Sequence, residues 1–383
     1  MIHGGNNIDT ESAKMTRRAF AGHGYELEEV SVLEPAAKSK LQTLLRERRQ
    51  DLAFFISSNF WALNVRSGTS LLHTLTGIPL VVLMHDHPVY FMHQLSSSLD
   101  GAIIFAPGAD AADFIAKYYP IRVRAIAYPG VLPSVAAAPP PRFEEFSARK
   151  NMLLCPINLI VEGLTIDDAW REIKALPRAR GARAERLAEA ALIDCETPLH
   201  VISECLSANG DPEIAIEDLR PVLNFVKLWR RTRLVEAIVE LPALISSGYV
   251  PPELARKYPK KFTTLTMSQT IPLYAQYRFV VNATPLLCYL IHDRLSEALL
   301  NNTACVTDAN VAVKQYFEDE KDMIFVDYGS PDLTGKISRF LDDPQRAFAL
   351  TVRCHEILRD ASFSKDAHEE LLSAVARPRK STA

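Results

Sequence analysis

The sequence predicts an α/β protein of two domains, each built on a parallel β-sheet. At 383 residues the chain exceeds the roughly 250–300 residues at which single hydrophobic cores stop growing. Short apolar runs alternate with segments of helical periodicity through both halves of the chain. Strands that alternate with helices form right-handed βαβ units, so consecutive strands run parallel.

The N-terminal half contains the clearer strand signals. The run IPLVVLMH (78–85) is rich in β-branched residues and is entered through Gly77 and Pro79. A helix is predicted at 109–119, between two further apolar runs. The other strands predicted in this half are 24–33, 51–58, 100–108 and 123–130.

Three consecutive prolines, preceded by alanines, predict an interdomain linker at 136–147. Each proline lacks an N–H and biases the preceding residue away from the helical region. We therefore expect an N-terminal domain over 1–135 and a C-terminal domain over 148–350 with a helical segment at 165–240. Terminal helices and a polar tail are expected over 351–383, where they can pack back on the N-terminal domain.

The C-terminal half repeats the α/β rhythm after its helical segment. A helix is expected to begin near His292. The strands predicted here are 151–158, 240–248, 261–267, 277–285, 303–309 and 322–329, and the later helices are 333–343 and 345–358.

Charge and composition exclude several classes of partner. The formal net charge is −3 and no long Lys/Arg run occurs, so neither nucleic acid nor an anionic membrane is an expected partner. The cluster Arg230, Arg231 and Arg233 is interpreted as the solvated face of a helix and left outside the functional site.

Cysteine usage and the apolar runs bear on metal sites and location. The six cysteines include no C-x-x-C pair, so neither a structural zinc site nor a disulfide framework is predicted. The first 18 residues lack the pattern of a secretory signal, and no apolar run reaches the roughly 18–20 residues of a membrane span. A cytoplasmic location is expected, and peripheral membrane association stays open.

An ordered set of motifs lies within residues 280–347. An Asn-x-x-Pro turn ends a strand, a helix opens on His-x-Arg followed by Glu-Ala, a strand ends in Thr-Asp, and a Phe-x-Asp-x-x-Asp segment precedes a closing helix. The residues are Asn282, Pro285, His292, Arg294, Glu297, Ala298, Thr307, Asp308, Phe317, Asp319 and Asp322. This order resembles the donor-binding half of group 1 glycosyltransferases of the GT-B type, particularly the CgeB-like branch.

A second segment, MHDHPVYF (84–91), resembles the Asp-His-Pro segment of the same family. Two positions depart from the family pattern. Asn302 replaces a glycine, which matters little because Asn also tolerates positive φ. The glycine-rich first loop is reduced to Gly4 and Gly5, so the first strand is abbreviated.

The resemblance implies two Rossmann-like domains whose parallel sheets face each other across a cleft, with the acceptor side in the N-terminal domain. It implies a glycosyltransferase that moves a sugar from a nucleotide-sugar donor to an unidentified acceptor, which could be a glycan, a lipid-linked glycan or a protein, without a metal or other cofactor. A catalytically silent nucleotide-sugar-binding subunit and a sugar-nucleotide epimerase on the same fold are the alternatives. The oligomeric state is left open.

The donor pocket is predicted at the turn 283–293 and the helix after it, since a helix N-terminus is a ready site for phosphates. Arg294 can meet phosphate oxygens with two parallel hydrogen bonds, and His292 can add a donor near the bond that breaks. Glu297, one turn further along, can accept from ribose hydroxyls. The alternative is that Arg294 and Glu297 form an ordinary surface ion pair.

Three further residues complete the predicted donor site. Asn282 begins the turn, and Thr284 and Thr307 are candidate phosphate or sugar contacts, although hydrogen bonding within turns and strand ends explains both threonines equally well. No Asp-x-Asp occurs in this region. We expect an arginine and the helix dipole to stabilise the leaving diphosphate in place of a metal.

The triplet His85-Asp86-His87 is the predicted catalytic group, because it follows a strand whose carboxyl end should face the cleft. Asp86 is the expected catalytic carboxylate, His87 orients it or shares its proton, and His85 is the third candidate. The alternative is that the triplet only hydrogen-bonds the strand end and the following turn.

Overall fold

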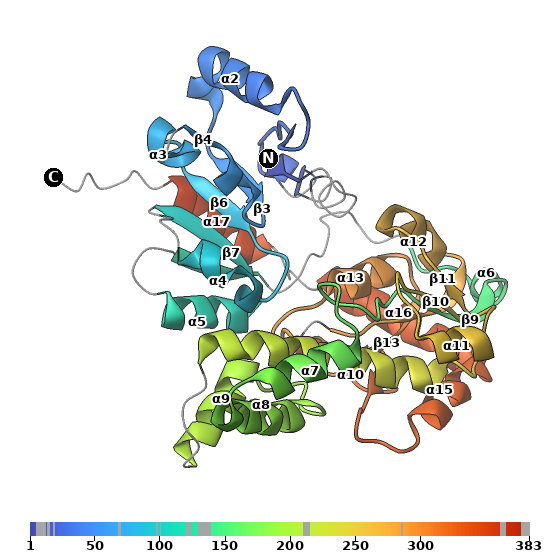
Figure 1. Ribbon diagram of the computed structural model, residues 1–383. Helices are drawn as coiled ribbons and strands as arrows, with labels where there is room; N and C mark the ends of the chain where they lie inside the picture. The colour runs from blue at the N-terminus through green and yellow to red at the C-terminus, as the bar shows by residue number, and fades with distance from the viewer. Residues whose placement is uncertain are drawn as a thin grey trace. The chain divides into compact units, whose positions relative to one another are not determined.

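The computed structural model describes residues 1–4, 13, 16–17, 20–67, 70–96, 99, 101–119, 124–128, 139–209, 215–284, 286–360 and 365–376. Pro285 and residues 136–138 of the expected linker lie outside them. The chain divides into two compact units, here called unit 1 (1–135 with 362–383) and unit 2 (136–361) (Figure 1). Each unit has a six-stranded sheet, so the predicted α/β class is confirmed.

The sheet of unit 1 is parallel throughout, in the order β2-β1-β3-β6-β7-β8. Strand order reverses around β1, so the carboxyl ends of β1 and β3 mark the switch point where open sheets of this kind bind ligands. The strands are β1 (Ile2–His3), β2 (Val30–Ser31), β3 (Phe55–Ser58), β6 (Leu80–Leu83), β7 (Ala102–Pro107) and β8 (Arg124–Tyr128). A separate antiparallel pair is formed by β4 (Arg66–Ser67) and β5 (Ser70–Leu71).

Apolar strands form the core of unit 1. Every residue of β7 is buried, and Val82 of β6 and Ile104 of β7 are wholly inaccessible. The C-terminal helix α17 packs against β8 and so belongs to this unit. The helices are α2 (Ala37–Glu47), α3 (Leu72–Thr76), α4 (Met92–Leu95), α5 (Ala109–Tyr118) and α17 (Lys365–Ala376), with 3-10 turns η1 (Arg49–Asp51), η2 (Trp61–Asn64) and η3 (Pro88–Phe91).

The strand expected over 24–33 is much shorter than predicted. Only Val30 and Ser31 pair with β1, which is two residues long, and Val32 adds one hydrogen bond from its backbone N–H to the carbonyl oxygen of His3 at 2.9 Å. The preceding Leu27–Glu29 are partly exposed. The alternation of apolar and acidic residues in this segment therefore marks its approach to the sheet and not a strand.

The sheet of unit 2 is also parallel, in the order β11-β10-β9-β12-β13-β14. In chain order this is 3-2-1-4-5-6, the Rossmann arrangement, with its switch point between β9 and β12. The strands are β9 (Lys150–Cys155), β10 (Ala243–Ser246), β11 (Phe262–Thr263), β12 (Tyr277–Val281), β13 (Ala304–Asp308) and β14 (Ile324–Val326).

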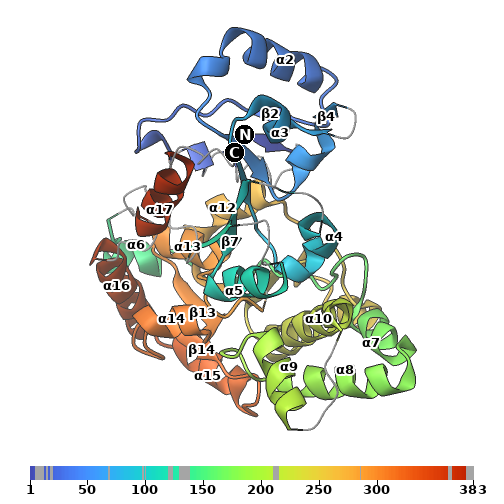
Figure 2. The same ribbon diagram turned by 90° about the vertical axis from the view of Figure 1, so that its left-hand side faces the viewer.

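The helical segment expected at 165–240 consists of four helices that lie side by side (Figure 2). They are α7 (Ile166–Ala175), α8 (Arg178–Ala191), α9 (Leu199–Ala208) and α10 (Leu219–Ile238), with the turn η4 (Ile216–Asp218). Leu234, Val235 and Ile238 of α10 enter the main core beside the strands. The remaining helices of unit 2 are α6 (Phe143–Ser147), α11 (Pro252–Lys257), α12 (Met267–Tyr274), α13 (Asp293–Leu300), α14 (Val311–Tyr316), α15 (Leu333–Leu341) and α16 (Pro344–Asp360).

The expected linker 136–147 is partly a helix of unit 2. Helix α6 begins directly after the prolines, where the side chain of Glu145 accepts a hydrogen bond from the backbone N–H of Arg142 at 3.0 Å. Phe146 is fully buried in the core of unit 2, and its ring contacts Phe348 of α16. The prolines end before residue 142, so they do not prevent a helix after it.

The boundary expected at 350 falls instead within α16. That helix is continuous to Asp360, and its Leu350 and Cys354 are buried in unit 2. The chain therefore leaves unit 2 only at residues 361–362.

Among the described residues, no helix is long and apolar enough to span a membrane.

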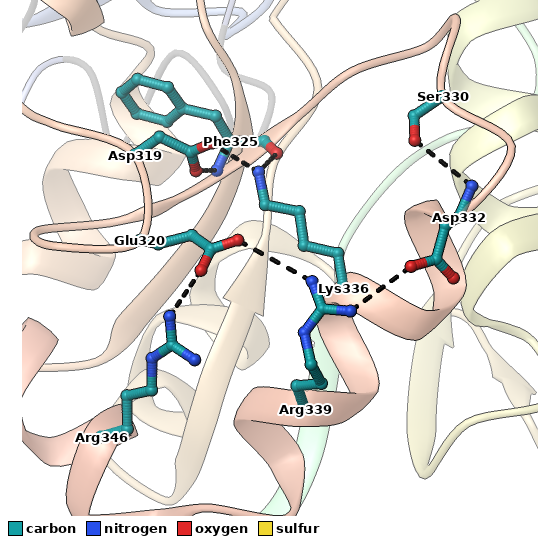
Figure 3. Close-up of polar contacts among 8 residues, drawn as sticks. All are labelled: Asp319, Glu320, Phe325, Ser330, Asp332, Lys336, Arg339 and Arg346. Atoms are coloured by element: carbon teal, nitrogen blue, oxygen red, sulfur yellow. Dashed lines mark hydrogen bonds and ion pairs between the residues drawn. The ribbon is translucent and has the colours of Figure 1, made fainter.

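The acidic segment around Asp319 fixes the last strand and helices of unit 2 (Figure 3). Asp319 accepts from the backbone N–H of Phe325 at 2.8 Å and from Lys336 Nζ at 2.6 Å. Glu320 contacts Arg339 and Arg346. These acidic side chains are engaged with α15 and α16, so their part in the Phe-x-Asp-x-x-Asp segment is structural.

Replacing Phe146 with alanine should destabilise unit 2 by about 3–5 kcal/mol, because a fully buried aromatic ring is removed from the core. The exposed Glu144 on the same helix supplies a control, Glu144→Ala. Urea unfolding followed by tryptophan fluorescence measures both, since Trp170 and Trp229 lie in unit 2. Equal urea-unfolding midpoints for the two variants would show that α6 does not contribute to the core of unit 2.

Candidate functional site

A buried carboxylate holds the turn that follows β12. Asp308, at the end of β13, accepts from the backbone N–H of Thr284 at 2.8 and 3.0 Å and from its hydroxyl at 2.9 Å. Both side chains are buried. Buried polar groups of this kind must find partners, and here two adjacent strand ends satisfy each other.

Asn282 links the same turn to the helix after it. Its amide donates to Thr307 Oγ1 at 3.0 Å, and its carbonyl oxygen accepts from Arg294 NH1 at 3.1 Å. Asn282 and Thr307 are themselves buried. Four predicted donor-site residues thus meet at the ends of β12 and β13: Asn282, Thr284, Arg294 and Thr307. The side chains of Asn282, Thr284 and Thr307 are hydrogen-bonded to protein groups, and Asn282 holds Arg294 in position.

The loop between this turn and α13 has a second anchor. Asn310, buried at the start of α14, donates its amide to the carbonyl oxygens of Leu287 and Leu290 at 3.0 and 2.9 Å. Helix α13 consequently begins at a fixed place, at the carboxyl edge of the sheet.

His292 caps α13 with its ring. Its Nδ1 accepts from the backbone N–H of Arg294 at 3.2 Å, so the neutral ring carries its proton on Nε2. Burial first, and then the positive charges of Arg294, Arg231 and Lys227, lower the pKa of His292 well below its ordinary value. The side chain is therefore a neutral hydrogen-bond donor at physiological pH.

Two backbone N–H groups in the first turn of α13, where the phosphate site is predicted, bind within the protein: those of Arg294 and Leu295. The imidazole of His292 already uses the N–H of Arg294, and Asp293 places an acidic side chain in the first turn. A free helix end would favour an anion. The side chains of His292 and Arg294 also lie at this end, and the phosphate site stays a prediction.

Two cations on α10 join the site, although the sequence predicts Arg231 to lie outside it. Arg231 NH1 donates to the carbonyl oxygen of Asn158 at 2.9 Å, in the loop after β9. Lys227, one turn earlier on the same face, is buried. Both charges lower the pKa of His292, and the hydrogen bond of Arg231 places positive charge from α10 beside the loop after β9.

The three clustered arginines do not share one face of α10. Arg230 is buried and donates to the carbonyl oxygens of Ala191 and Leu192 at the end of α8, at 2.7 and 3.0 Å. Only Arg233 is exposed. The interpretation of the cluster as a solvated face is therefore wrong for Arg230, and it overlooked Arg231, whose neighbour in space is a loop 73 residues earlier in the chain.

Glu297 lies one turn after Arg294 and is partly buried. Burial raises the pKa of Tyr274 to about 12. The charge of Arg294 lowers this pKa and that of Glu297 raises it, so both side chains lie near Tyr274. Glu297 thus lies beside Arg294 on the face of α13 that meets the end of α12. Its predicted contact with a ribose stays a prediction.

The histidine–aspartate triplet lies at the carboxyl end of β6 in unit 1. His85 N–H donates to Asn59 Oδ1 at 3.0 Å, which ties this end to the end of β3. His87 is buried, its Nδ1 accepts from Val89 N–H at 3.2 Å, and its ring contacts Phe114. Of the three, His85 and Asp86 are partly exposed.

Residues 230–372 match the family model described as glycosyl transferase-like. No curated protein matches the chain in sequence. The fold is similar to that of Anabaena HepE in complex with UDP and glucose, with a TM-score of 0.52, 11% identity and coverage of 98% of this chain and 99% of that chain. An α-glucosyltransferase in complex with UDP-glucose and DNA containing an abasic site gives a TM-score of 0.54 at 12% identity, with 98% of both chains covered.

The fold is that of GT-B glycosyltransferases. The matched domain at 230–372 and this fold together indicate a glycosyltransferase, as the sequence predicts. The domain begins within α10 and includes α13, so it contains Arg231, His292 and Arg294. Membership of the CgeB-like branch stays a prediction.

The stability of the protein should depend on the protonation of His292. Its folded pKa lies below the ordinary 6.5, so at mildly acidic pH the unfolded chain binds more protons and stability falls as pH drops below about 6.5, until the folded pKa is passed. His292→Asn keeps a capping acceptor without a titrating ring. Its urea-unfolding free energy should fall less between about pH 7 and pH 5 than that of the wild type.

His93→Asn, at an exposed histidine of unit 1, is the matched control and should retain the wild-type pH dependence. The same slope in both variants would show that His292 titrates normally.

Proposed function

We propose that the protein transfers a sugar from a nucleoside diphosphate sugar to an acceptor hydroxyl, and that Arg294, Arg231, Lys227 and His292 hold the diphosphate without a metal. One observation carries the proposal. Three cations and a neutral imidazole converge on the carboxyl ends of β9 and β12, which form the switch point of a Rossmann sheet.

The chemistry of the leaving group explains why cations are needed there. When the bond between the anomeric carbon and the diphosphate breaks, its electron pair stays on the phosphate oxygen, and negative charge grows on the diphosphate. Donors placed in advance at that position lower the barrier. An arginine can bind two phosphate oxygens at once, and Nε2–H of His292 adds a neutral donor.

Glu297 is proposed to accept from the ribose hydroxyls, since it lies one turn beyond Arg294. The buried Asn282, Thr284 and Thr307 are proposed to act mainly by positioning, because their side chains form hydrogen bonds to other protein groups. Uridine diphosphate is the first nucleotide to test, given the UDP and UDP-glucose bound by the structural neighbours.

Asp86 is proposed as the base that takes the acceptor's proton, with His85 beside it. His87 is proposed to hold the turn that presents Asp86, because its Nδ1 accepts a hydrogen bond from Val89 N–H.

A cytoplasmic location and a role in glycan biosynthesis are proposed from the sequence alone. Turnover of the donor separates a transferase from an epimerase, which interconverts it, and from a silent binder, which leaves it intact.

Arg294→Ala and Arg231→Ala should each weaken binding of uridine diphosphate about 10- to 100-fold, because a hydrogen bond to a charged group contributes about 1.5–3 kcal/mol. Binding of uridine, which lacks phosphates, should change little. Isothermal calorimetry measures both. Arg233→Ala, on the same helix with an exposed side chain, is the control, and a loss of affinity equal to that of Arg231→Ala would place the diphosphate elsewhere.

Donor turnover should persist in excess EDTA, since the proposed charge stabilisation comes from side chains. Release of uridine diphosphate from UDP-glucose, followed over time, provides the measurement. Turnover that stops in EDTA and returns with Mg²⁺ or Mn²⁺ would contradict a metal-independent site.

Asp86→Asn should lower the rate of sugar transfer about 10²-fold or more, because acid–base assistance contributes about 10²–10⁴, while the affinity for uridine diphosphate stays unchanged. Asp113→Asn, at an exposed position of α5, is the matched control. Near-normal transfer by the Asp86 variant would make the triplet structural.

A further inference from the structure

A tryptophan stands at the switch point of unit 1. Trp61 begins η2, which directly follows β3 and contacts β1. The turn is fixed in place, because Ala62 N–H donates to Ser57 Oγ on β3 at 2.9 Å. An open parallel sheet binds its ligands outside the carboxyl ends of the strands at this point.

The indole of Trp61 is partly exposed and, among the described residues, makes no hydrogen bond or ring contact. The other two tryptophans of the chain are engaged: Trp170 lies 4.8 Å from Phe225, and Trp229 lies 6.3 Å from Tyr328, measured between ring centroids. The part of the Trp61 indole that is exposed at this ligand-binding edge is available to a ligand.

The proposed base lies on the neighbouring loop. Asn59, two residues before Trp61, accepts from the backbone N–H of His85, so the ends of β3 and β6 are hydrogen-bonded together. Phe60 precedes Trp61 in the sequence, and Phe91 follows His87 by four residues. The centroids of their rings lie 5.1 Å apart. The loop with Trp61 and the loop with Asp86 therefore form one packed surface.

The two loops are poor in cationic side chains. Neither residues 59–65 nor residues 84–96 contain lysine or arginine, and the nearest cationic residue along the chain is Arg66. An acceptor that carries phosphates, whether a lipid phosphate or a nucleic acid, is normally held by such residues. The two loops instead offer aromatic rings, a carboxylate and imidazoles.

We propose that the acceptor is a neutral carbohydrate, with one sugar ring packed on the indole of Trp61 and one hydroxyl directed to Asp86. The apolar C–H face of a sugar ring carries slight positive charge and suits the negative face of an aromatic ring. A carboxylate accepts hydrogen bonds from hydroxyls. This inference rests on the proposed function and names the class of its second substrate.

The transfer forms one bond and breaks another. The acceptor hydroxyl oxygen forms a bond to the anomeric carbon of the donor sugar, and the bond from that carbon to the diphosphate breaks. The bonding electron pair leaves with the nucleoside diphosphate. The hydroxyl proton passes to the Asp86 carboxylate and from there to water.

The test uses the full chain with UDP-glucose and three acceptors: a neutral disaccharide such as cellobiose or maltose, a polyprenyl phosphate, and a single-stranded DNA oligonucleotide. Mass spectrometry should detect hexosyl transfer to a neutral saccharide. Trp61→Ala should raise the KM for that saccharide about tenfold or more, and Trp61→Phe, which keeps a ring, should recover most of the loss. Trp170→Phe is the control and should match the wild type.

Transfer only to the polyprenyl phosphate or only to DNA would overturn the inference, as would an unchanged saccharide KM in Trp61→Ala. Calorimetry with uridine diphosphate on the same samples keeps the two proposals apart. If the nucleotide binds and no neutral saccharide is glycosylated, the inference on the acceptor fails alone. If the nucleotide does not bind to the wild type, the proposed function itself fails.

Discussion

The buried carboxylate of Asp308 is the interaction on which the candidate donor site depends. It binds the backbone and the hydroxyl of Thr284 and so fixes the end of β12 against the end of β13. From that turn Asn282 reaches Arg294, and the cap of His292 sets the first turn of α13. A carboxylate buried in this way is costly without partners, so the turn and the strand end stabilise each other.

The donor site brings three cationic side chains together around a histidine that stays neutral. Arg294 comes from α13, whereas Lys227 and Arg231 come from α10, and His292 between them stays neutral because burial and these charges lower its pKa. A protonated imidazole would add a fourth positive charge to a crowded site. The neutral ring keeps a hydrogen-bond donor, and an incoming diphosphate would offset the repulsion among the remaining cations.

Much of the fold could be predicted from the sequence because buried parallel strands are apolar on both faces, as β7 and the last three residues of β9 illustrate. Likewise, the helix start at His292 was predicted from a local motif, and the residues Asn282, Thr284, Arg294 and Thr307 do converge. The contribution of Arg231 could not be predicted. Helical periodicity describes which residues share a face, but the loop that covers that face, here at Asn158, depends on long-range packing.

Helix α6 was missed for a related reason. The prolines before it control only their own residues and the ones just preceding them, while the burial of Phe146 depends on Phe348, far along the chain. The short pairing of β2 has the same origin, because the length of a strand is limited by its partner.

A crystal structure of the protein with uridine diphosphate bound tests the central claim most directly. We expect both phosphates at the carboxyl ends of β9 and β12, within hydrogen-bond distance of Arg294, Arg231 and Nε2 of His292. A nucleotide whose phosphates lie over β13 and β14, or anywhere on unit 1, would contradict it.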